Sequence, residues 1–481
     1  MKVLLLNPPF IGRFSRTSRS PGVSRSGTLY YPLWLIYTAG VLDQNGLEVS
    51  FIDAPAEGLA ASEVIARAKE SPPQLIVIDT STPSIYNDIK VAEQLKENFP
   101  ASFITLVGTH PSALPHETLQ LSDQVDAVAR GEYDYTIRDL AAGLSNGSDL
   151  SAIDGLVFRQ NGEIVENRPR ALIENLDELP FISRAYRKFL ETRNYFFAAS
   201  DYPMVMVITG RGCPYKCFFC VYPQTFHSRQ YRPRSPKNVV DEFEYISQNM
   251  PEVREIGIED DTFTVDQARA REICQLIIKR NLRVKWYCNV RVNLEPETMR
   301  WMKQAGCHLV TVGFESANQA ILNKMHKGIT VEQIKEFVSN ARNAGLLVHG
   351  CFMAGNPGET RETLEETLKL AKELNCDTMQ FYPLLVYPGT EAYQWAKEND
   401  YLTTDDFRQW ATEEATFNCV LNLPGLSTDD INAFCARANR EYYLRPRYML
   451  MKLKQVILHP NEIRRTLKGA RAYFGMLRKG L

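Results

Sequence analysis

Shortly after the apolar run 204–209 the chain reads Arg211-Gly212-Cys213-Pro214-Tyr215-Lys216-Cys217-Phe218-Phe219-Cys220. The three cysteines have the spacing C-x3-C-x2-C, which brings three thiolates together in one short loop. Three thiolates can bind three irons of a four-iron cluster and leave the fourth iron without a protein ligand, because a complete cubane takes four cysteines. An open coordination position is typical of a catalytic metal site. The stretch therefore predicts a metal centre that takes part in chemistry.

Zinc is the alternative for these cysteines. A C-x2-C pair is often half of a zinc site or a redox pair, and zinc would need a fourth ligand nearby. His227 lies seven residues after Cys220, so the spacing alone leaves a Cys3His zinc site open.

The composition of the whole chain is that of a globular protein. Its 481 residues are enough for two or three domains. The 55 basic and 57 acidic residues give a net charge of −2, which offers no overall attraction to nucleic acid. Its other cysteines are scattered singly, which indicates reduced thiols and a cytoplasmic protein. The apolar run after Lys2 is too short for a signal peptide, and no run is long enough for a transmembrane helix.

The first 150 residues alternate apolar runs with helical patterns. Strand, helix and strand at this spacing predict a doubly wound, Rossmann-like parallel sheet in residues 1–150. We expect strands at 3–6, 49–52, 75–79, 103–107 and 125–129, and helices at 33–45, 62–70 (capped by Ser62) and 85–98. In such a sheet, ligands bind beyond the carboxyl ends of the strands.

Two further segments belong to the N-terminal half of the chain. Residues 151–200 are expected to hold a β-hairpin with its turn at Asn161-Gly162, and then a linker. Segment 13–28 is rich in Arg, Ser and Gly. We expect it to be a mobile, solvated loop over the first domain, with arginines that could meet an anionic group.

From residue 201 to residue 400 the alternation of strands and helices resumes. Six strand–helix repeats predict a partial (β/α)6 barrel, since a full eightfold barrel takes roughly 250 residues. We expect strands at 204–209, 255–259, 284–289, 309–314, 348–353 and 378–383, and helices at 237–249, 266–281, 296–305, 330–344 and 360–374. The cysteine loop follows the first strand, at the face where parallel α/β folds hold their active sites.

The cysteine motif, with Phe219 before its last cysteine, resembles the signature of the radical S-adenosylmethionine (SAM) superfamily. The resemblance implies a [4Fe–4S] cluster on Cys213, Cys217 and Cys220, with SAM on the open iron and a 5′-deoxyadenosyl radical as the reactive species. Helix capping by Asp261 or Thr262 is the alternative role for the acidic segment after the second strand. The segments at the strand ends imply SAM contacts from Phe219, Glu259, Asp260, Asn289, Arg291, Glu315, Ser316 and Gly355.

A doubly wound domain before such a barrel resembles the cobalamin-dependent class of radical SAM enzymes, and most of all the hopanoid ring-contracting enzymes and the anaerobic magnesium-protoporphyrin ester cyclases. The motif Asp-x-His-x-x-Gly, in which a histidine binds cobalt, is absent from this chain. His110 is therefore expected to contact the corrin and not the cobalt. The resemblance implies cobalamin contacts from Asn7, Pro8, Thr80, Ser81, Thr82, Ser84, Gly108, His110, Gly131 and Glu132.

Residues 401–481 are expected to form a helical region, with helices at 405–411 and 427–443, the second capped by Ser427. The tail 445–481 holds ten Lys and Arg residues against a single acid, Glu462, with apolar residues between them. Such a tail could touch an anionic membrane or pack as a solvated helical cap. Leu384, Val386 and Tyr387, after the sixth strand, are expected to line an apolar substrate pocket or to pack in the core.

These features predict a cytoplasmic enzyme that methylates an unactivated carbon of an apolar small molecule. The resemblance implies a low-potential electron donor, such as flavodoxin or ferredoxin, and no nucleic acid. Two alternatives stay open. One is a radical rearrangement, ring contraction or cyclisation on a lipid-linked or tetrapyrrole-like substrate. The other is a non-catalytic, metal-stabilised binding module.

Overall fold

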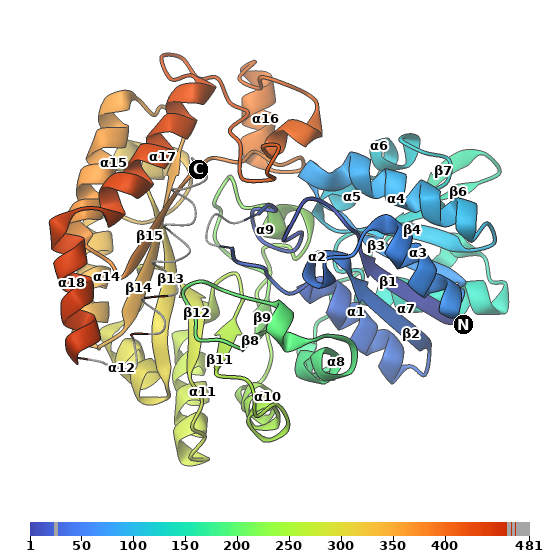
Figure 1. The fold of residues 1–481 in the computed structure, drawn as a ribbon, viewed down its shortest axis with the longest axis horizontal. Coiled ribbons are helices and arrows are strands. Elements are labelled where there is room, and N and C mark those ends of the chain that lie inside the picture. The colour runs from blue at the N-terminus through green and yellow to red at the C-terminus, as the bar shows by residue number, and fades with distance from the viewer. Residues whose placement is uncertain (24–26, 459–462, 464–466, 468–481) are drawn as a thin grey trace.

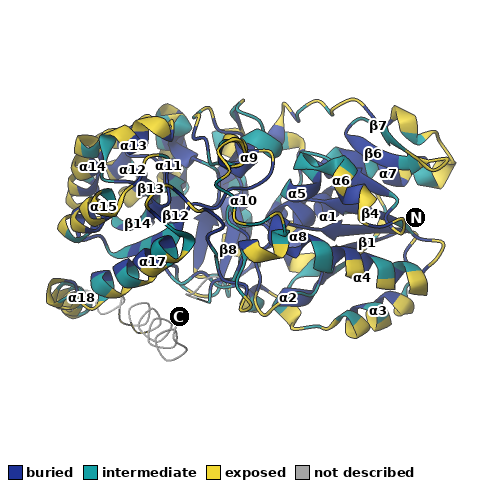
Figure 2. Cartoon of the chain, turned by 90° about the horizontal axis from the view of Figure 1, so that it is seen from above, coloured by how far each residue is buried: buried dark blue, intermediate teal, exposed yellow. Residues whose placement is uncertain are grey.

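The computed structural model describes residues 1–23 and 27–458 together with Ile463 and Leu467. Two α/β bodies stand side by side, the N-terminal one on the right of Figure 1 and the barrel on the left. Seen from above in Figure 2, the sheets are buried and the helices present their exposed faces outward. Among the described residues, no helix has the length and apolar character needed to cross a membrane.

The N-terminal body is a seven-stranded sheet in the order β2-β1-β3-β4-β5-β6-β7. The first five strands are parallel, and the expected hairpin extends the sheet antiparallel to β5. Its strands are β1 (Lys2–Asn7), β2 (Glu48–Asp53), β3 (Leu75–Asp79), β4 (Phe103–Val107), β5 (Ala127–Ala129), β6 (Leu156–Gln160) and β7 (Glu163–Glu166). The helices of this half are α1 (Leu33–Gln44), α2 (Ala54–Glu57), α3 (Ala61–Glu70), α4 (Ile85–Asn98), α5 (Thr109–Ala113), α6 (Pro115–Gln120), α7 (Asp134–Asn146) and α8 (Ile182–Phe189).

Strand alternation explains why this sheet is covered on both faces. Leu4 and Leu6 of β1 point into one hydrophobic core, and Leu5 points into the other. Because successive side chains of a strand point to opposite faces, an unbroken apolar run is what a sheet between two helical layers needs. The Rossmann-like fold expected for this half of the chain is confirmed.

The second body is a six-stranded parallel sheet in the order β15-β14-β13-β12-β11-β8. This order is that of a partial barrel, as expected. Its strands are β8 (Met204–Val207), β11 (Glu255–Ile258), β12 (Trp286–Val290), β13 (Cys307–Glu315), β14 (Leu347–Ala354) and β15 (Thr378–Pro383). The helices around it are α9 (Val221–Thr225), α10 (Pro236–Asn249), α11 (Gln267–Lys279), α12 (Pro296–Gln304), α13 (Gln319–Lys324), α14 (Val331–Asn343), α15 (Arg361–Leu374) and α16 (Glu391–Glu398).

The described part of the C-terminal region is helical, and two expected details, one here and one in the N-terminal body, are wrong. The Ser427 side chain caps α17 (Thr428–Tyr443), as expected, and α18 (Pro446–Leu458) follows. The helix expected at 405–411 is a single 3-10 turn, Phe407–Trp410. The expected Ser62 cap of α3 is wrong, because that helix begins one residue earlier and the Glu63 side chain accepts from the Ala60 N–H. The part of the tail beyond Leu458 lies largely outside the described residues.

The described part of segment 13–28 is not a solvated loop, contrary to expectation. Arg16 is buried in the N-terminal body, where it forms a bidentate ion pair with Asp88 at 2.6 and 3.1 Å. Arg19 reaches the barrel, and its guanidinium donates to the carbonyl oxygens of Glu259 and Asp260. The described part of the segment therefore runs between the two bodies and is held by both.

Candidate active site

The cysteine loop begins where β9 (Gly210–Arg211) pairs with β10 (Arg232–Pro233). Gly212 has a φ of +83°, and a Cβ atom there would lie 2.0 Å from the Gln230 carbonyl oxygen. Only glycine fits such a left-handed, crowded position without strain. Gly212 thus sets the turn that carries Cys213, and Cys220 ends the loop at the start of α9.

The three thiols are largely withdrawn from solvent. Cys213 and Cys217 are buried, and Cys220 is half-buried. Burial raises the pKa of the Cys213 and Cys220 thiols. The Cys213 sulfur lies 4.0 Å from the Thr262 hydroxyl, and Arg291 Nη1 lies 3.6 Å from the Cys217 sulfur.

The structure gives His227 a different role from that of a fourth zinc ligand. His227 is buried against Trp34, and its Nδ1 lies 3.1 Å from Glu132 Oε1. Within the described part of the chain, no three His, Cys, Asp or Glu side chains converge on one metal ion. A cluster in which each cysteine binds a different iron does not need such convergence.

Glu315 and Arg291 lie beside this loop. Glu315 has a φ of +67°, unusual for a residue with a side chain. Its Oε1 accepts from Lys327 Nζ at 2.6 Å, whereas its buried Oε2 lacks a hydrogen-bond partner among the described residues. Arg291 lies over the Tyr215 ring at 3.7 Å and donates to the Lys327 carbonyl oxygen. The unpartnered carboxylate oxygen fits a ligand with hydroxyl groups, such as the ribose of SAM.

The acidic residues after β11 divide into two roles. Asp260 accepts from the N–H and the hydroxyl of Thr209, each at 2.6 Å, so it ties β11 to the end of β8. Glu259 accepts from Tyr287 and Asn289 at 3.1 and 3.2 Å and borders the cavity described below. Neither Asp261 nor Thr262 caps the next helix with its side chain, because Asp266 holds that position in α11.

Three other residues expected to contact SAM lie in the same region of the barrel. Phe219 is half-buried, and its ring lies 5.8 Å from Lys327 Nζ. Ser316 is fully buried directly after Glu315. Gly355, at the end of β14, has a φ of +93° and packs against Ile431 of α17.

Glu359, which was not among the expected site residues, organises the loop that contains Gly355. Its carboxylate accepts from the N–H groups of Gly355 and Asn356 at 2.6 and 2.9 Å. Burial raises the pKa of Glu359 to about 7 despite these hydrogen bonds. The sequence could have shown this role, because Glu359 follows Gly355 by only four positions.

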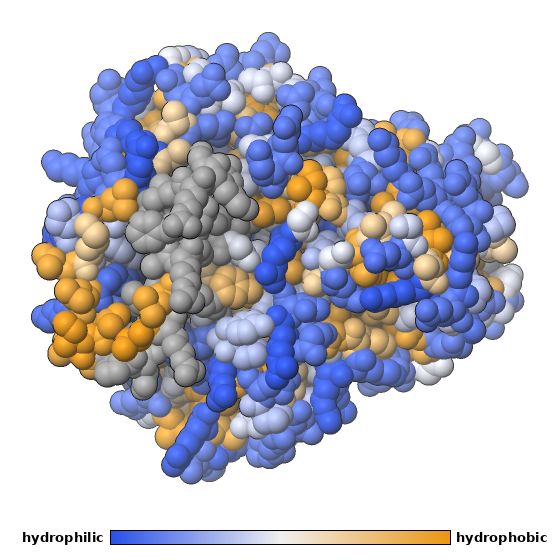
Figure 3. All heavy atoms as spheres, in the orientation of Figure 1, coloured by the Kyte–Doolittle hydropathy of each residue, from blue (hydrophilic) through white to orange (hydrophobic). Residues whose placement is uncertain are grey.

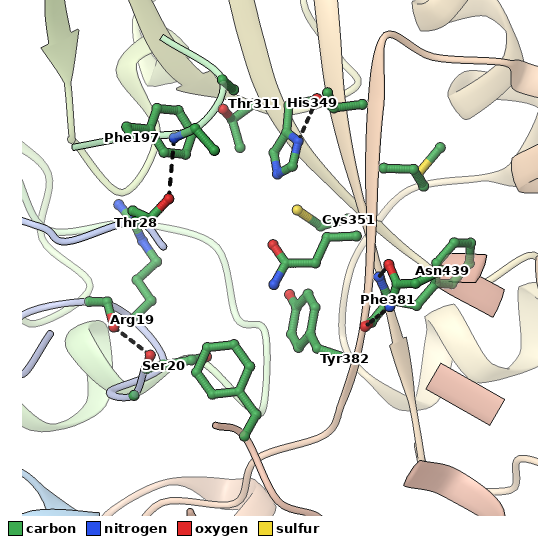
Figure 4. A pocket seen from close by; sticks show the side chains of 18 of the residues that line it. Arg19, Ser20, Thr28, Phe197, Thr311, His349, Cys351, Phe381, Tyr382 and Asn439 are labelled. Atoms are coloured by element: carbon green, nitrogen blue, oxygen red, sulfur yellow. Dashed lines mark hydrogen bonds between the residues drawn. The ribbon is translucent and has the colours of Figure 1, made fainter. Parts of the chain in front are cut away.

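A cavity of about 590 Å³ lies between the barrel strands, the described part of segment 13–28 and the C-terminal helices, and Glu259 and Asn289 line it. On the barrel side its wall is formed by residues of β13, β14 and β15, and Figure 4 shows Thr311, His349, Cys351 and Tyr382 around the cavity. His349 Nδ1 lies 2.8 Å from the Thr378 hydroxyl, and burial lowers the pKa of His349 to about 4, so the ring is neutral near pH 7. The residues of these three strands that line it are Thr311, His349, Cys351, Thr378, Met379, Gln380, Phe381, Tyr382 and Pro383.

Of the two roles expected for the residues after β15, core packing is correct and lining of the pocket is not. Leu384, Val386 and Tyr387 are buried in the hydrophobic core and do not line the cavity. The whole of β15, Thr378–Pro383, lines it instead, together with His349 and Cys351 of β14. Strand alternation was visible in the sequence, but it did not show which face of these strands would stay uncovered.

At the carboxyl ends of the N-terminal strands, several of the expected cobalamin contacts bind one another. Asp88 accepts from the hydroxyls of Thr80 and Ser84, each at 2.6 Å, and pairs with Arg16. Arg16 also donates to the Asn7 side chain at 2.8 Å and to the Pro8 carbonyl oxygen at 2.7 Å. This buried network closes the crevice between the strand ends.

The remaining expected contacts lie around that crevice. Ser81 is within 2.9 Å of Ser84, and Thr82 is 3.2 Å from His110 Nδ1. The His110 ring packs edge-on against Phe407, and burial lowers the pKa of His110 to about 3. A Cβ atom on Gly108 would lie 2.2 Å from the Thr80 carbonyl oxygen, so only glycine fits there.

The residues that follow β5, at the edge toward the barrel, fit a polar ligand better than the crevice at the other strand ends does. Gly131 has a φ of +64° and faces the Phe226 carbonyl oxygen. Tyr133, whose ring contacts Phe226, has a buried hydroxyl with no hydrogen-bond partner in the described part of the chain. Glu132 binds Arg232 and His227, so it joins the two bodies. A polar cofactor at this edge would meet the Tyr133 hydroxyl, whereas entry into the crevice would displace Arg16.

Comparisons with known proteins agree with this arrangement. The family model "Radical SAM superfamily" matches residues 207–371, and the model "B12 binding domain" matches residues 19–141. A protein named as an uncharacterized methyltransferase, PH0819 of Pyrococcus horikoshii, is 33% identical over 98% of this chain and 99% of its own length. The anaerobic magnesium-protoporphyrin IX monomethyl ester cyclase of Rubrivivax gelatinosus is 28% identical over 85% of this chain and 72% of its own length.

A solved structure shares the whole fold. The radical SAM methyltransferase TsrM of Kitasatospora setae superposes with a TM-score of 0.71 at 18% identity, over 92% of this chain and 89% of its own. The chain belongs to the radical SAM enzymes that carry a cobalamin-binding domain. Its cofactors are accordingly SAM, a [4Fe–4S] cluster and cobalamin, and it is an enzyme.

Proposed function

We propose that this enzyme transfers a methyl group to an unactivated carbon of a small, largely apolar molecule. The observation that carries the proposal is the cavity, which borders Glu259 and Asn289 at one end and is walled by barrel strands. The relative with the highest identity given above is named a methyltransferase. In this proposal residues 1–150 bind cobalamin, 151–200 add a hairpin to that domain and connect it to the next, 201–400 bind SAM and the cluster, and the described part of the helical region 401–481 closes the cavity.

The bound cofactors supply a carbon-centred radical and a methyl group. Cys213, Cys217 and Cys220 hold the cluster, and the Glu315 carboxylate and Arg291 guanidinium hold the polar groups of SAM. The barrel wall orients the substrate and keeps water from the reacting carbon. Phe219, Asn289, Ser316 and Gly355 complete the proposed SAM contacts.

The partners are part of the same proposal. A low-potential protein such as flavodoxin or ferredoxin would reduce the cluster in the cytoplasm, where the thiols stay reduced. The ten cations of the C-terminal tail support a peripheral contact with a membrane.

Anaerobic reconstitution tests the proposal. With SAM and dithionite, the wild-type enzyme should release 5′-deoxyadenosine, and the electron paramagnetic resonance signal of the reduced cluster should shift when SAM is added. With substrate and SAM labelled with deuterium in its methyl group, the product should carry that label. A colourless protein that contains zinc, or one that yields no 5′-deoxyadenosine, would contradict the proposal.

A radical rearrangement or cyclisation is the second candidate function. The similarity to the magnesium-protoporphyrin cyclase supports it, as do the hydrogen-bonding side chains His349, Gln380 and Tyr382 of the cavity wall. The mass of the product separates the two reactions. Methylation adds one methylene to the substrate, whereas a rearrangement leaves its mass unchanged.

A further inference from the structure

Helix α18 carries an exposed apolar face. Met449, Leu450, Leu453 and Ile457 are 52, 66, 58 and 68% exposed. At about 100° per residue these four side chains fall within an arc of roughly 100° on one side of the helix. Tyr448, on the other side, is buried and donates to the Asp377 carbonyl oxygen at 2.8 Å. In Figure 3 the hydrophobic side chains gather over this helix. One face of α18 thus packs on the barrel, and no other described residue covers the opposite face.

Basic residues border the uncovered face. Residues 445–458 contain four basic residues and no acidic one. Arg447 and Lys454 are exposed on one side of the apolar arc. Lys452 lies on the other side, where its Nζ is 3.6 Å from Asp377 and 2.9 Å from Gln455. An apolar helix face with cations along its edges is the pattern of a helix that lies in the headgroup region of an anionic membrane.

The cavity opens beside this face. Leu444, Tyr448, Met449 and Lys452 line it at α18, and Cys351 and His349 line it deeper in the barrel. An apolar molecule that leaves the lipid next to Met449 would enter the cavity without crossing water. Met449 belongs both to the cavity wall and to the apolar face of α18. Lys452 belongs to the cavity wall and borders that face.

We propose that α18 docks on an anionic membrane surface and that the substrate, an apolar molecule dissolved in the lipid, enters the cavity beside Met449. The entry route rests on the proposed function, because it takes the cavity as the active site. The charge of the face favours lipid over a second copy of the chain. Two copies meeting through α18 would bring their basic edges together, and like charges at an interface are unfavourable.

Vesicle flotation of the full-length enzyme tests the docking. The wild-type chain should float with vesicles of equal parts phosphatidylglycerol and phosphatidylcholine and should float poorly with phosphatidylcholine alone. The triple variant Leu450→Ser, Leu453→Ser, Ile457→Ser should bind at least about tenfold more weakly, because three apolar side chains no longer enter the lipid. Arg447→Gln and Lys454→Gln should each weaken binding about fivefold.

Ile278→Ser is the matched control, because Ile278 is a 41% exposed apolar residue on α11. This variant should float like the wild type. The iron content and 5′-deoxyadenosine yield of every variant show that it is folded, and neither readout involves lipid. Failure of the docking is thereby separated from failure of the proposed function.

The entry route is tested with Met449→Trp, which places a fluorophore at the mouth of the cavity. Brominated phosphatidylcholine in the anionic vesicles should quench the added fluorescence, whereas the signal added by Ile278→Trp should be unaffected. The proposal is overturned if the wild type floats no better than the triple variant, or if the added tryptophan at 449 is not quenched. It is also overturned if the wild type is a dimer that the triple variant converts to a monomer.

Discussion

At the scale of single residues, the cluster cysteines differ from the other cysteines in their surroundings. Cys274, Cys288 and Cys307 lie in helices and strands of the hydrophobic core. Cys217 lies in a loop, next to the Arg291 guanidinium. The three loop cysteines, unlike these core cysteines, stand together in one loop where a cluster can bind them.

Replacing one loop cysteine should therefore abolish the cluster. We expect Cys217→Ala, reconstituted anaerobically, to lose the brown colour and most of its bound iron, and to release 5′-deoxyadenosine only at background level, because one iron loses its protein ligand. Iron analysis and absorbance spectra measure this. Cys274→Ala, on α11, is the control and should keep its iron. Equal iron in both variants would contradict the assignment.

The raised pKa of Asp79 leads us to expect that the stability of the protein depends on pH. Burial raises the pKa of Asp79 to about 7, with Asp88 and Asp53 adding to the shift and Arg16 opposing it. The folded protein thus binds a proton that the unfolded chain releases near pH 4. The stabilisation is fully present below about pH 4 and is lost, at up to about 1.4 kcal/mol per pH unit, as the pH rises to 7.

The variant Asp79→Asn should remove this dependence, because an amide stays neutral at every pH. Its thermal unfolding midpoint should exceed that of the wild type by more at pH 8 than at pH 5. The exposed Asp123 provides the control, since Asp123→Asn should follow the wild type at both pH values. Parallel pH profiles for Asp79→Asn and the wild type would refute the buried protonated carboxyl.

At the scale of elements, the described part of segment 13–28 connects the two bodies through two arginines. Arg16 forms its ion pair in the N-terminal body, with neither side chain exposed. Arg19 binds the residues that follow β11. The charges of an Arg-rich segment predicted contact with anions, and the anions proved to be carboxylates of the chain itself.

Arg16→Ala should destabilise the N-terminal body strongly. The substitution leaves the Asp88 carboxylate buried without its cation, and breaking a buried pair costs about 3–5 kcal/mol. A lower midpoint of thermal unfolding, followed by circular dichroism, is the expected result. The double variant Arg16→Met, Asp88→Leu should recover part of the loss, since it removes both charges. If the midpoint of the double variant fell as far as that of Arg16→Ala, the unpaired charge would not be the cause of the destabilisation.

At the scale of the whole molecule, buried ion pairs join the two bodies. Arg211 of the barrel lies 2.7 Å from Asp134 of α7, and Arg232 binds Glu132 after β5. Trp34 of the N-terminal body packs at the same interface, where its ring lies 5.3 Å from the Arg211 guanidinium. This interface holds the cobalamin-binding domain against the loop that carries the cysteines.

Asp134→Ala should loosen this interface. With Arg211 unpaired in a buried position, we expect the thermal midpoint to fall by several degrees and limited proteolysis to cut the chain between the two bodies sooner. Asp139→Ala is the control, because Asp139 lies on the same helix but pairs with the half-buried Arg170 at the surface. Identical digestion rates for the two variants would show that the Asp134 pair does not hold the bodies together.

The sequence by itself determined the order of strands and helices, the two bodies and the cluster motif. These features depend on short-range patterns, namely apolar periodicity, turn residues and cysteine spacing. The tertiary structure alone decided the place of segment 13–28, since Arg16 and Asp88 are 72 residues apart and no local pattern pairs them. It also decided that His349 and Gln380, rather than Leu384 and Val386, line the cavity. Alternation assigns side chains to two faces, but which face stays open depends on how the barrel curves and where the C-terminal helices pack.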